Sequence, residues 1–207
     1  MEISVARALT ELKTINNRIE KKIDETIFIA GVKKTSKKIK NVYTRDEFIE
    51  LAKSNYQSIK DLIKRRKDIK SAIVESNANT IVEIAGVKMS VADAIERKNS
   101  IELDKMLLAE MTRDYNSIVS QVQAQNEDVE MRLDSLLNSS IGSDKKDLSG
   151  MEGFAKAYRE SNEYEIINPL NLEDEIKKLS KQIEDFESEV DAVLTESNVM
   201  TKIEIPD

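Results

Sequence analysis

Lysine side chains are concentrated between residues 33 and 40, where the sequence reads KKTSKKIK. Thr35 and Ser36, which carry hydroxyl groups, lie between these lysines in the sequence, and a helix is expected to begin a few residues later. Ammonium groups, hydroxyl groups and the free amides of a helix N-terminus all bind phosphate and similar anions. A solvated flexible loop is the alternative interpretation. The pattern predicts a candidate anion site formed by Lys33, Lys34, Lys37, Lys38 and Lys40.

Two further groups of cations lie within predicted helices. The sequence KRRK at 64–67 places Arg66 near an apolar stripe, between Leu62 and Ile69, where an unpaired charge is costly. Pairing with an acid of a later helix is one interpretation, and a position facing a channel in an oligomer is another. Candidate anion ligands therefore also include Arg65, Arg66, Arg97 and Lys98, for which an ordinary solvated helix face is the alternative.

The residue types needed for most catalysis are missing from the sequence. The chain has 207 residues and contains neither His nor Cys, which excludes His-based triads, His-ligated zinc and thiolate chemistry. No phosphate-binding, dinucleotide-binding or serine-nucleophile motif is present. Carboxylates at helical spacing, such as Glu102 and Asp114, are interpreted as solvated faces. We predict a protein that is not an enzyme and has no catalytic residue, metal or cofactor.

The charge is distributed unevenly along the chain. The net charge is −7, but residues 1–75 carry +7 and residues 76–207 carry −14. Either the two parts neutralise each other in a bundle or oligomer, or the basic part contacts an anion. The acidic isoelectric point of about 5.0 and the lack of interleaved aromatic residues argue against nucleic acid as a partner.

The sequence gives no indication of a membrane segment. The opening residues MEISVARALTELK are amphipathic and contain acids, unlike a signal or transit peptide. No apolar run approaches the roughly 20 residues that span a bilayer. We expect a cytoplasmic protein without a membrane partner.

Hydrophobic periodicity predicts long helices, with few glycines or prolines to interrupt them. Apolar residues at three- and four-residue steps indicate helices over 3–22, 44–75 and 90–137, and a heptad rhythm follows Pro169. Thr44 to Glu47 and Ser90 to Asp93 have capping-box spacing. A helix of some 48 residues would be about 70 Å long, which predicts an elongated molecule. We expect a core over 1–137, a connector over 138–168 with one short helix at 151–160, and a closing helix and strand over 169–207.

Short sequence repeats follow three of the helices. ESNANTIVEI (75–84) and ESNVMTKIEI (196–205) agree at six of ten positions, and IAGVK occurs at both 29–33 and 84–88. We interpret these as a repeated helix–turn–strand unit in which Ser and Asn end each helix. Strands over 26–32, 80–85 and 200–205 are then expected to form one small sheet; chance similarity is the alternative.

Four segments of the chain read SVARALTELKTINNRIEKKI, DLIKRRKDIKSAIVESNANT, IAGVKMSVADAIERKNSIELDKMLL and VDAVLTESNVMT. They resemble segments of the septicolysin-like family of uncharacterised helical proteins and of related phage-encoded proteins. Asn99 stands where the family usually has Asp, and Val199 where it has Trp. The resemblance implies a long helical hairpin with a small β element that assembles as a homo-oligomer, and a phage origin.

These observations predict a mainly α fold, an elongated long-helix bundle or coiled coil with a small β-sheet element. For function we expect a homo-oligomeric binding protein that captures an anionic ligand, such as a nucleotide signalling molecule, or a host protein, and thereby inhibits it. A phage virion or assembly protein is the alternative.

Overall fold

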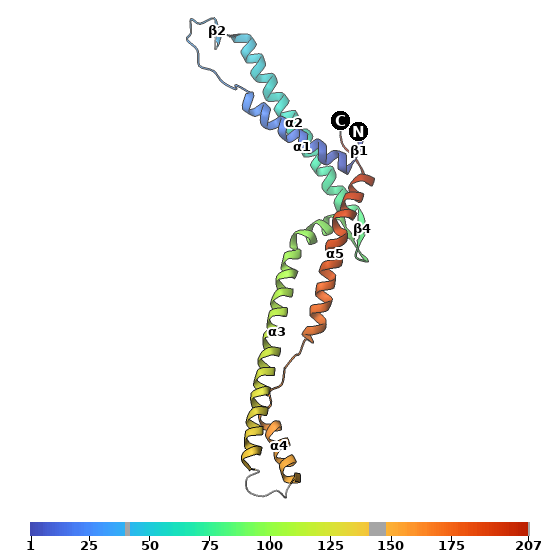
Figure 1. The fold of residues 1–207 in the computed structure, drawn as a ribbon. Coiled ribbons are helices and arrows are strands. Elements are labelled where there is room, and N and C mark those ends of the chain that lie inside the picture. Colours follow the sequence, from blue (N-terminus) through green and yellow to red (C-terminus); the bar gives the residue numbers. More distant parts are fainter. Residues whose placement is uncertain (40–41, 141–147, 207) are drawn as a thin grey trace. The chain divides into compact units, whose positions relative to one another are not determined.

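A computed structural model describes residues 1–39, 42–140 and 148–206 (Figure 1). It confirms a mainly helical fold with short antiparallel strand pairs. The chain forms two compact units, of which unit 1 comprises Met1–Asn99 with Phe186–Asp207 and unit 2 comprises Ser100–Asp185. The boundaries between the units, after Asn99 and after Asp185, each fall inside a long helix. The divisions expected from sequence were at residues 137 and 168.

The described residues form helices and strands in a simple order. The helices are α1 (Val5–Glu25), α2 (Arg45–Asn79), α3 (Val91–Ser140), α4 (Leu148–Asn162) and α5 (Leu172–Met200). The strands are β1 (Glu2–Ser4), β2 (Lys38–Ile39), β3 (Tyr43–Thr44), β4 (Ile81–Ile84), β5 (Val87–Ser90) and β6 (Lys202–Glu204). They pair as β1 with β6, β2 with β3, and β4 with β5.

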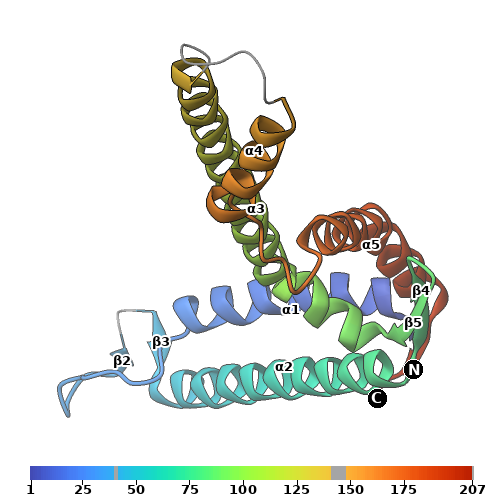
Figure 2. The same cartoon turned by 90° about the horizontal axis from the view of Figure 1, so that it is seen from below.

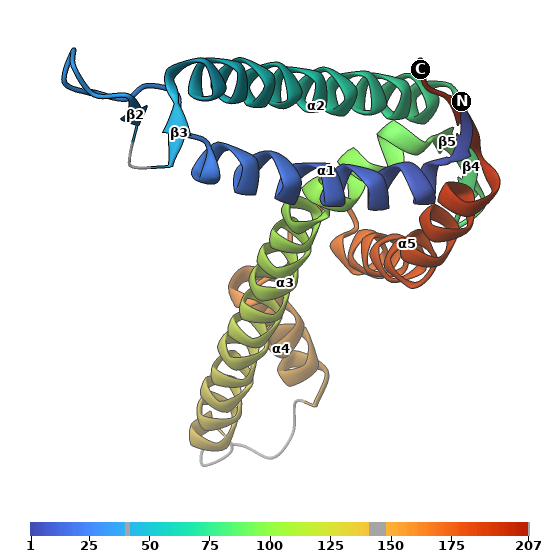
Figure 3. The same cartoon turned by 90° about the horizontal axis from the view of Figure 1, so that it is seen from above.

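In unit 1, helices α1 and α2 lie side by side as a hairpin (Figure 3). Their facing apolar stripes meet the β1–β6 pair in one buried cluster, since side chains three and four residues apart share a helix face. The buried members of this cluster are Ile3, Val5, Ala8, Ile15, Ile69, Ile73, Ile203 and Ile205.

Local hydrogen bonds fix where the two longest helices begin. The Thr44 Oγ1 accepts from the Glu47 amide at 3.3 Å, while the Thr44 amide donates to the Glu47 carboxylate at 2.8 Å. At the start of α3, the Asp93 amide donates to Ser90 Oγ at 3.0 Å, and the Ser90 amide donates to the Asp93 carboxylate at 3.4 Å. Both capping boxes expected from spacing are therefore confirmed.

The predicted ends of the helices need a correction. Helix α2 does not break at 76–79 but continues to Asn79, whose side-chain amide donates to the Glu75 carbonyl at 2.9 Å. Asn thus satisfies a helical carbonyl from inside the last turn instead of ending the helix.

The predicted three-stranded sheet is wrong. Residues 26–32 form no strand, and the other two expected strands lie in separate pairs. β4 pairs with β5 across a two-residue turn at Ala85 and Gly86, where φ is +50° and +73°. Positive φ at both central residues is the type I′ geometry that matches the twist of a hairpin.

Unit 1 contains a structural duplication. The arrangement α5–β6 beside β1–α1 matches α2–β4 beside β5–α3. Thr201 and Thr80 follow the two corresponding helices, and each donates its amide to a carbonyl four residues earlier at 2.9 Å. The Val5 amide then donates to the Thr201 carbonyl at 3.0 Å, and the Val91 amide to the Thr80 carbonyl at 2.9 Å. The repeated ESN sequences therefore mark equivalent helix-to-strand junctions.

The duplication extends into the helices that leave the strands. Sequence analysis missed a second repeat, SVARAL at 4–9 and SVADAI at 90–95, in which Ala8 and Ala94 are both fully buried. Further along, Arg65 of α2 contacts Glu11 of α1, and at the equivalent positions Phe186 of α5 contacts Arg97 of α3. One half of unit 1 is α5, β6, β1 and α1, and the other is α2, β4, β5 and α3. Each half thus contacts the other through equivalent positions, as the subunits of a two-fold dimer do.

In unit 2, helix α4 lies along α3. Arg159 of α4 donates from Nε and Nη2 to the Glu130 carboxylate of α3 at 2.6 and 2.9 Å. Asn126 and Tyr164 exchange hydrogen bonds at 3.0 and 2.8 Å. The short helix expected at 151–160 is confirmed with wider bounds, and side-chain contacts attach it to α3.

Candidate functional site

The candidate anion site lies in the connection between α1 and α2, at the end of unit 1 away from the strand pair β1–β6 (Figure 2). We call residues 26–39 the basic loop. Its last residues form β2, which pairs with β3 in the register Lys38 with Thr44 and Ile39 with Tyr43. The Ile39 side chain is buried and anchors this end of the loop.

Hydrogen bonds hold the backbone of the basic loop. Arg45 Nη2 donates to the carbonyls of Lys33 and Lys34 at 3.1 and 2.9 Å. The Ser36 amide donates to the Lys33 carbonyl at 2.9 Å, and the Ser36 hydroxyl donates to the Lys38 carbonyl at 2.9 Å. These bonds hold the backbone between residues 33 and 38, and the solvated flexible loop, the other interpretation of the sequence, stays an alternative.

The lysine side chains of the basic loop are exposed. Within the described part of the chain, the ammonium groups of Lys33, Lys34 and Lys37 form no hydrogen bond or ion pair. Lys38 lies near Glu47, whose pKa is lowered chiefly by the hydrogen bond from the Thr44 amide and least by the Lys38 charge. The remaining predicted ligand, Lys40, lies outside the described residues.

Exposed apolar side chains flank these lysines. Phe28 and Val32 are exposed, and Ile29 retains 87% of its accessible surface. Val42, between β2 and β3, is exposed as well. Sequence reasoning interpreted TIFIAGV as a strand because Ile, Phe and Val favour sheets, and so missed that these side chains are exposed in the same loop as the lysines.

Arg65 and Arg66 do not belong to this surface. Arg65 is about 30 Å along α2 from Arg45, at 1.5 Å per residue. It pairs with Glu11 at 3.2 Å and donates from Nη1 to the Pro206 carbonyl at 2.6 Å. Arg66 Nε donates to Asn16 Oδ1 at 2.6 Å. The acid of a later helix expected as the partner of Arg66 is thus wrong, because the partner is Asn16 of α1, beside α2 in the hairpin.

Arg97 and Lys98 are held by α5 within unit 1. The guanidinium carbon of Arg97 lies 4.8 Å from the centre of the Phe186 ring, and Lys98 forms an ion pair with Asp191. A cation over an aromatic face is attracted by the ring's negative potential. The structure therefore leaves the loop lysines exposed and gives the four helical cations partners within unit 1.

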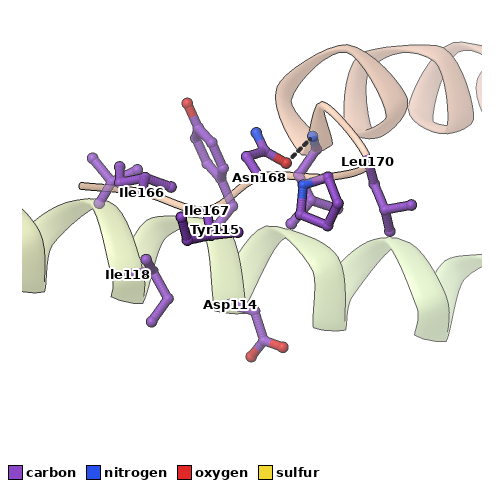
Figure 4. A pocket seen from close by; sticks show the side chains of 10 residues that line it. Asp114, Tyr115, Ile118, Ile166, Ile167, Asn168 and Leu170 are labelled. Carbon is purple, nitrogen blue, oxygen red and sulfur yellow. Dashed lines mark hydrogen bonds between the residues drawn. The ribbon is translucent and has the colours of Figure 1, made fainter.

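An apolar pocket that sequence analysis missed lies in unit 2 (Figure 4). It has a volume of about 260 Å³ and is lined by Tyr115 and Ile118 of α3 and by Ile166, Ile167 and Leu170 of the segment before α5. The Tyr115 hydroxyl donates to the Glu173 carboxylate at 3.2 Å, and this negative charge raises the pKa of Tyr115. The signal available in the sequence was the apolar run IINPL within a polar connector.

A shallow polar groove lies in unit 1 where the two duplicated junctions meet. Its volume is about 520 Å³, and its lining includes Glu75, Asn79, Thr80, Thr201 and Lys202. These groups can hydrogen-bond a polar molecule.

Within the described residues, no group of three Asp or Glu side chains is placed to hold a metal ion. No helix in the described part of the chain is long and apolar enough to cross a bilayer. Comparison with protein-family models, curated proteins and solved structures finds no match to this chain.

Proposed function

We propose that the protein is a non-enzymatic binding protein that captures an anionic ligand on its basic loop. The observation that carries this proposal is the group of exposed lysines at 33, 34, 37 and 38 on a hydrogen-bonded backbone. No acid occurs between residues 26 and 45, although the chain contains 39 acids. A surface of one charge sign attracts oppositely charged ligands from solution.

The helical cations are not part of the proposed site. Arg65, Arg66 and Lys98 are neutralised or hydrogen-bonded within unit 1, and recruiting them would break those contacts. The loop lysines can meet an anion without such a cost. If the protein is phage-encoded, as its sequence resemblance implies, capture would inhibit the host process that uses the ligand.

The proposal is tested by calorimetric titration with inorganic tripolyphosphate. Replacing Lys33, Lys34, Lys37 and Lys38 by Ala should abolish the binding heat, because four exposed ammonium groups are lost. The matched control replaces Lys53, Lys60, Lys67 and Lys70 on the exposed surface of α2, and it should bind within about threefold of the wild type, because exposed charges beyond the screening length contribute little. Equal loss in both variants would contradict a site at the loop.

A virion or assembly protein is the second candidate. Leu103, Met106 and Leu107 form an exposed apolar face on α3, of the kind that a second copy could cover. Light scattering tests the assembly role, since assembly requires an oligomer that Leu103→Asp with Leu107→Asp converts to monomer. A wild-type monomer at all accessible concentrations would contradict the assembly role.

A further inference from the structure

We propose that the anionic partner of the basic loop is the surface of a lipid bilayer, on which the loop docks without spanning it, in contrast to the expectation from sequence that the protein has no membrane partner. This inference rests on the proposed function, because it assumes that the loop lysines bind anions, and it names the anion as lipid phosphate. The observation that goes beyond anion binding is the set of exposed apolar side chains that precede the lysines in the same loop.

The apolar side chains of the loop are more exposed than a soluble anion site requires. Ile29 is 87% exposed and Phe28 is 46% exposed. They are adjacent in sequence and shortly precede Lys33. Transfer of such side chains from water to the acyl boundary of a bilayer is favourable, in proportion to the apolar area removed from water. A small soluble anion would leave this area in water.

The charge of the loop fits an anionic bilayer and orients the protein on it. The basic loop carries four lysines and no acid, a charge of +4, so the rest of the chain carries −11 within the total of −7. Anionic lipids attract the loop and repel the remaining surface. Docking through the loop is therefore the orientation that electrostatics favours.

The choice of Lys over Arg favours lipid over protein as the partner. Lysine is depleted in protein interfaces and arginine is enriched, because the guanidinium group binds carboxylates through two parallel hydrogen bonds. The ammonium groups of the loop act as point charges, which suits a fluid layer of headgroups without fixed geometry. The nearby Arg45 is engaged by the carbonyls of Lys33 and Lys34.

The hydrogen bonds of the loop reduce the entropy lost on docking. Arg45 and Ser36 already fix the backbone on which the lysines are carried. A surface ordered before binding spends less of its interaction energy on ordering during binding.

Sedimentation with vesicles tests the inference. The full chain should bind vesicles of phosphatidylcholine and phosphatidylglycerol and should not bind phosphatidylcholine alone. Replacing Lys33, Lys34, Lys37 and Lys38 by Ala should weaken binding by about a hundredfold or more, since each lysine near the headgroups contributes to the attraction. Phe28→Ser with Ile29→Ser should weaken it by about tenfold or more.

Matched controls separate the loop from the rest of unit 1. Ala replacements at Lys53, Lys60, Lys67 and Lys70 remove the same charge from α2, and Tyr56→Ser with Ile63→Ser removes exposed apolar surface from the same helix. Both control variants should bind the vesicles with an affinity within about threefold of the wild type, since charges and apolar side chains that lie away from the bilayer contribute little.

A fluorescent reporter measures insertion directly. The chain contains no Trp, so Phe28→Trp introduces a single indole in the loop and Tyr56→Trp introduces one on α2. The emission of the loop Trp should shift to shorter wavelength with anionic vesicles and should be quenched by brominated acyl chains. The emission of the α2 Trp should not change.

The outcomes distinguish this inference from the proposed function. Tripolyphosphate binding that depends on the loop lysines, without vesicle binding, would overturn the lipid inference and leave anion capture standing. Binding of neither probe would overturn both. Vesicle binding that survives the Phe28 and Ile29 replacements, without a shift of the loop Trp, would reduce the contact to charge alone and overturn the proposed insertion.

Discussion

The carboxyl group of Glu130 shows how one long-range contact sets the properties of a residue. Hydrogen bonds from Arg159 lower the pKa of Glu130, and the same contact raises the pKa of Arg159. Because the pKa of this carboxyl group is lower in the folded protein than in the unfolded chain, the group stabilises the fold at a pH where it is ionised in both the folded and the unfolded state. This stabilisation is lost as the pH falls through the pKa of the folded state.

We therefore predict that Glu130→Gln lowers the melting temperature of the protein slightly at neutral pH. The difference from wild type should shrink as the pH falls below the ordinary range of a Glu carboxyl, because the wild type then loses the same charge. Thermal unfolding followed by circular dichroism at several pH values measures it. Glu152→Gln is the control, since this Glu of α4 is exposed and forms no ion pair with any residue that the structure describes; a difference independent of pH would contradict the argument.

Residue contacts were predictable from sequence only where the partners are neighbours. The Thr44 and Glu47 capping box is a three-residue pattern, and the structure contains it. The partner of Arg65 could not be predicted, because Glu11 lies 54 residues away and comes close only through the α1–α2 hairpin. The same holds for Arg97 and Phe186, whose contact depends on α3 and α5.

At the scale of elements, the duplication of unit 1 explains the repeated sequences. Each repeat carries a Thr after a helix and a Ser before the next, and the strands between them pair in the same register. One pair is closed by the turn at Ala85 and Gly86, and the other joins β1 to β6. Equivalent positions should therefore respond alike to substitution.

We predict that Ala8→Leu and Ala94→Leu each destabilise the protein by about 1–3 kcal/mol, because both side chains are fully buried and extra carbon atoms must displace their neighbours. Ala92→Leu, on the exposed face of α3, should change stability by less than about 0.5 kcal/mol. Urea unfolding measures all three. A large loss at only one of the buried positions would contradict equivalence of the two halves.

Helices were easier to predict than strands for a physical reason. A helix satisfies its hydrogen bonds within a contiguous segment, so periodicity over α2 or α5 is sufficient evidence. A strand needs a partner, and residues 26–32 have strand-forming side chains but no strand opposite them. The partner of β6 is β1, three residues that the sequence analysis placed largely within the first helix.

At the scale of the whole molecule, charge distribution was predictable but its use was not. The excess of cations before residue 76 is visible in the sequence, and three separate groups of cations, nine residues in all, were candidate anion ligands. The structure assigns four of those residues to contacts within unit 1 and leaves the loop lysines exposed. Which cations are engaged depends on tertiary contacts, which composition does not reveal.

The central claim is that the basic loop, and not the helical cations, is the anion-binding surface. The most direct test is a map of backbone amide chemical shifts of the ¹⁵N-labelled protein during titration with tripolyphosphate. The account predicts saturable shifts confined to residues 26–45, with none at Arg65, Arg66, Arg97 or Lys98. Shifts centred on those helical residues, or no saturable shifts anywhere, would contradict it.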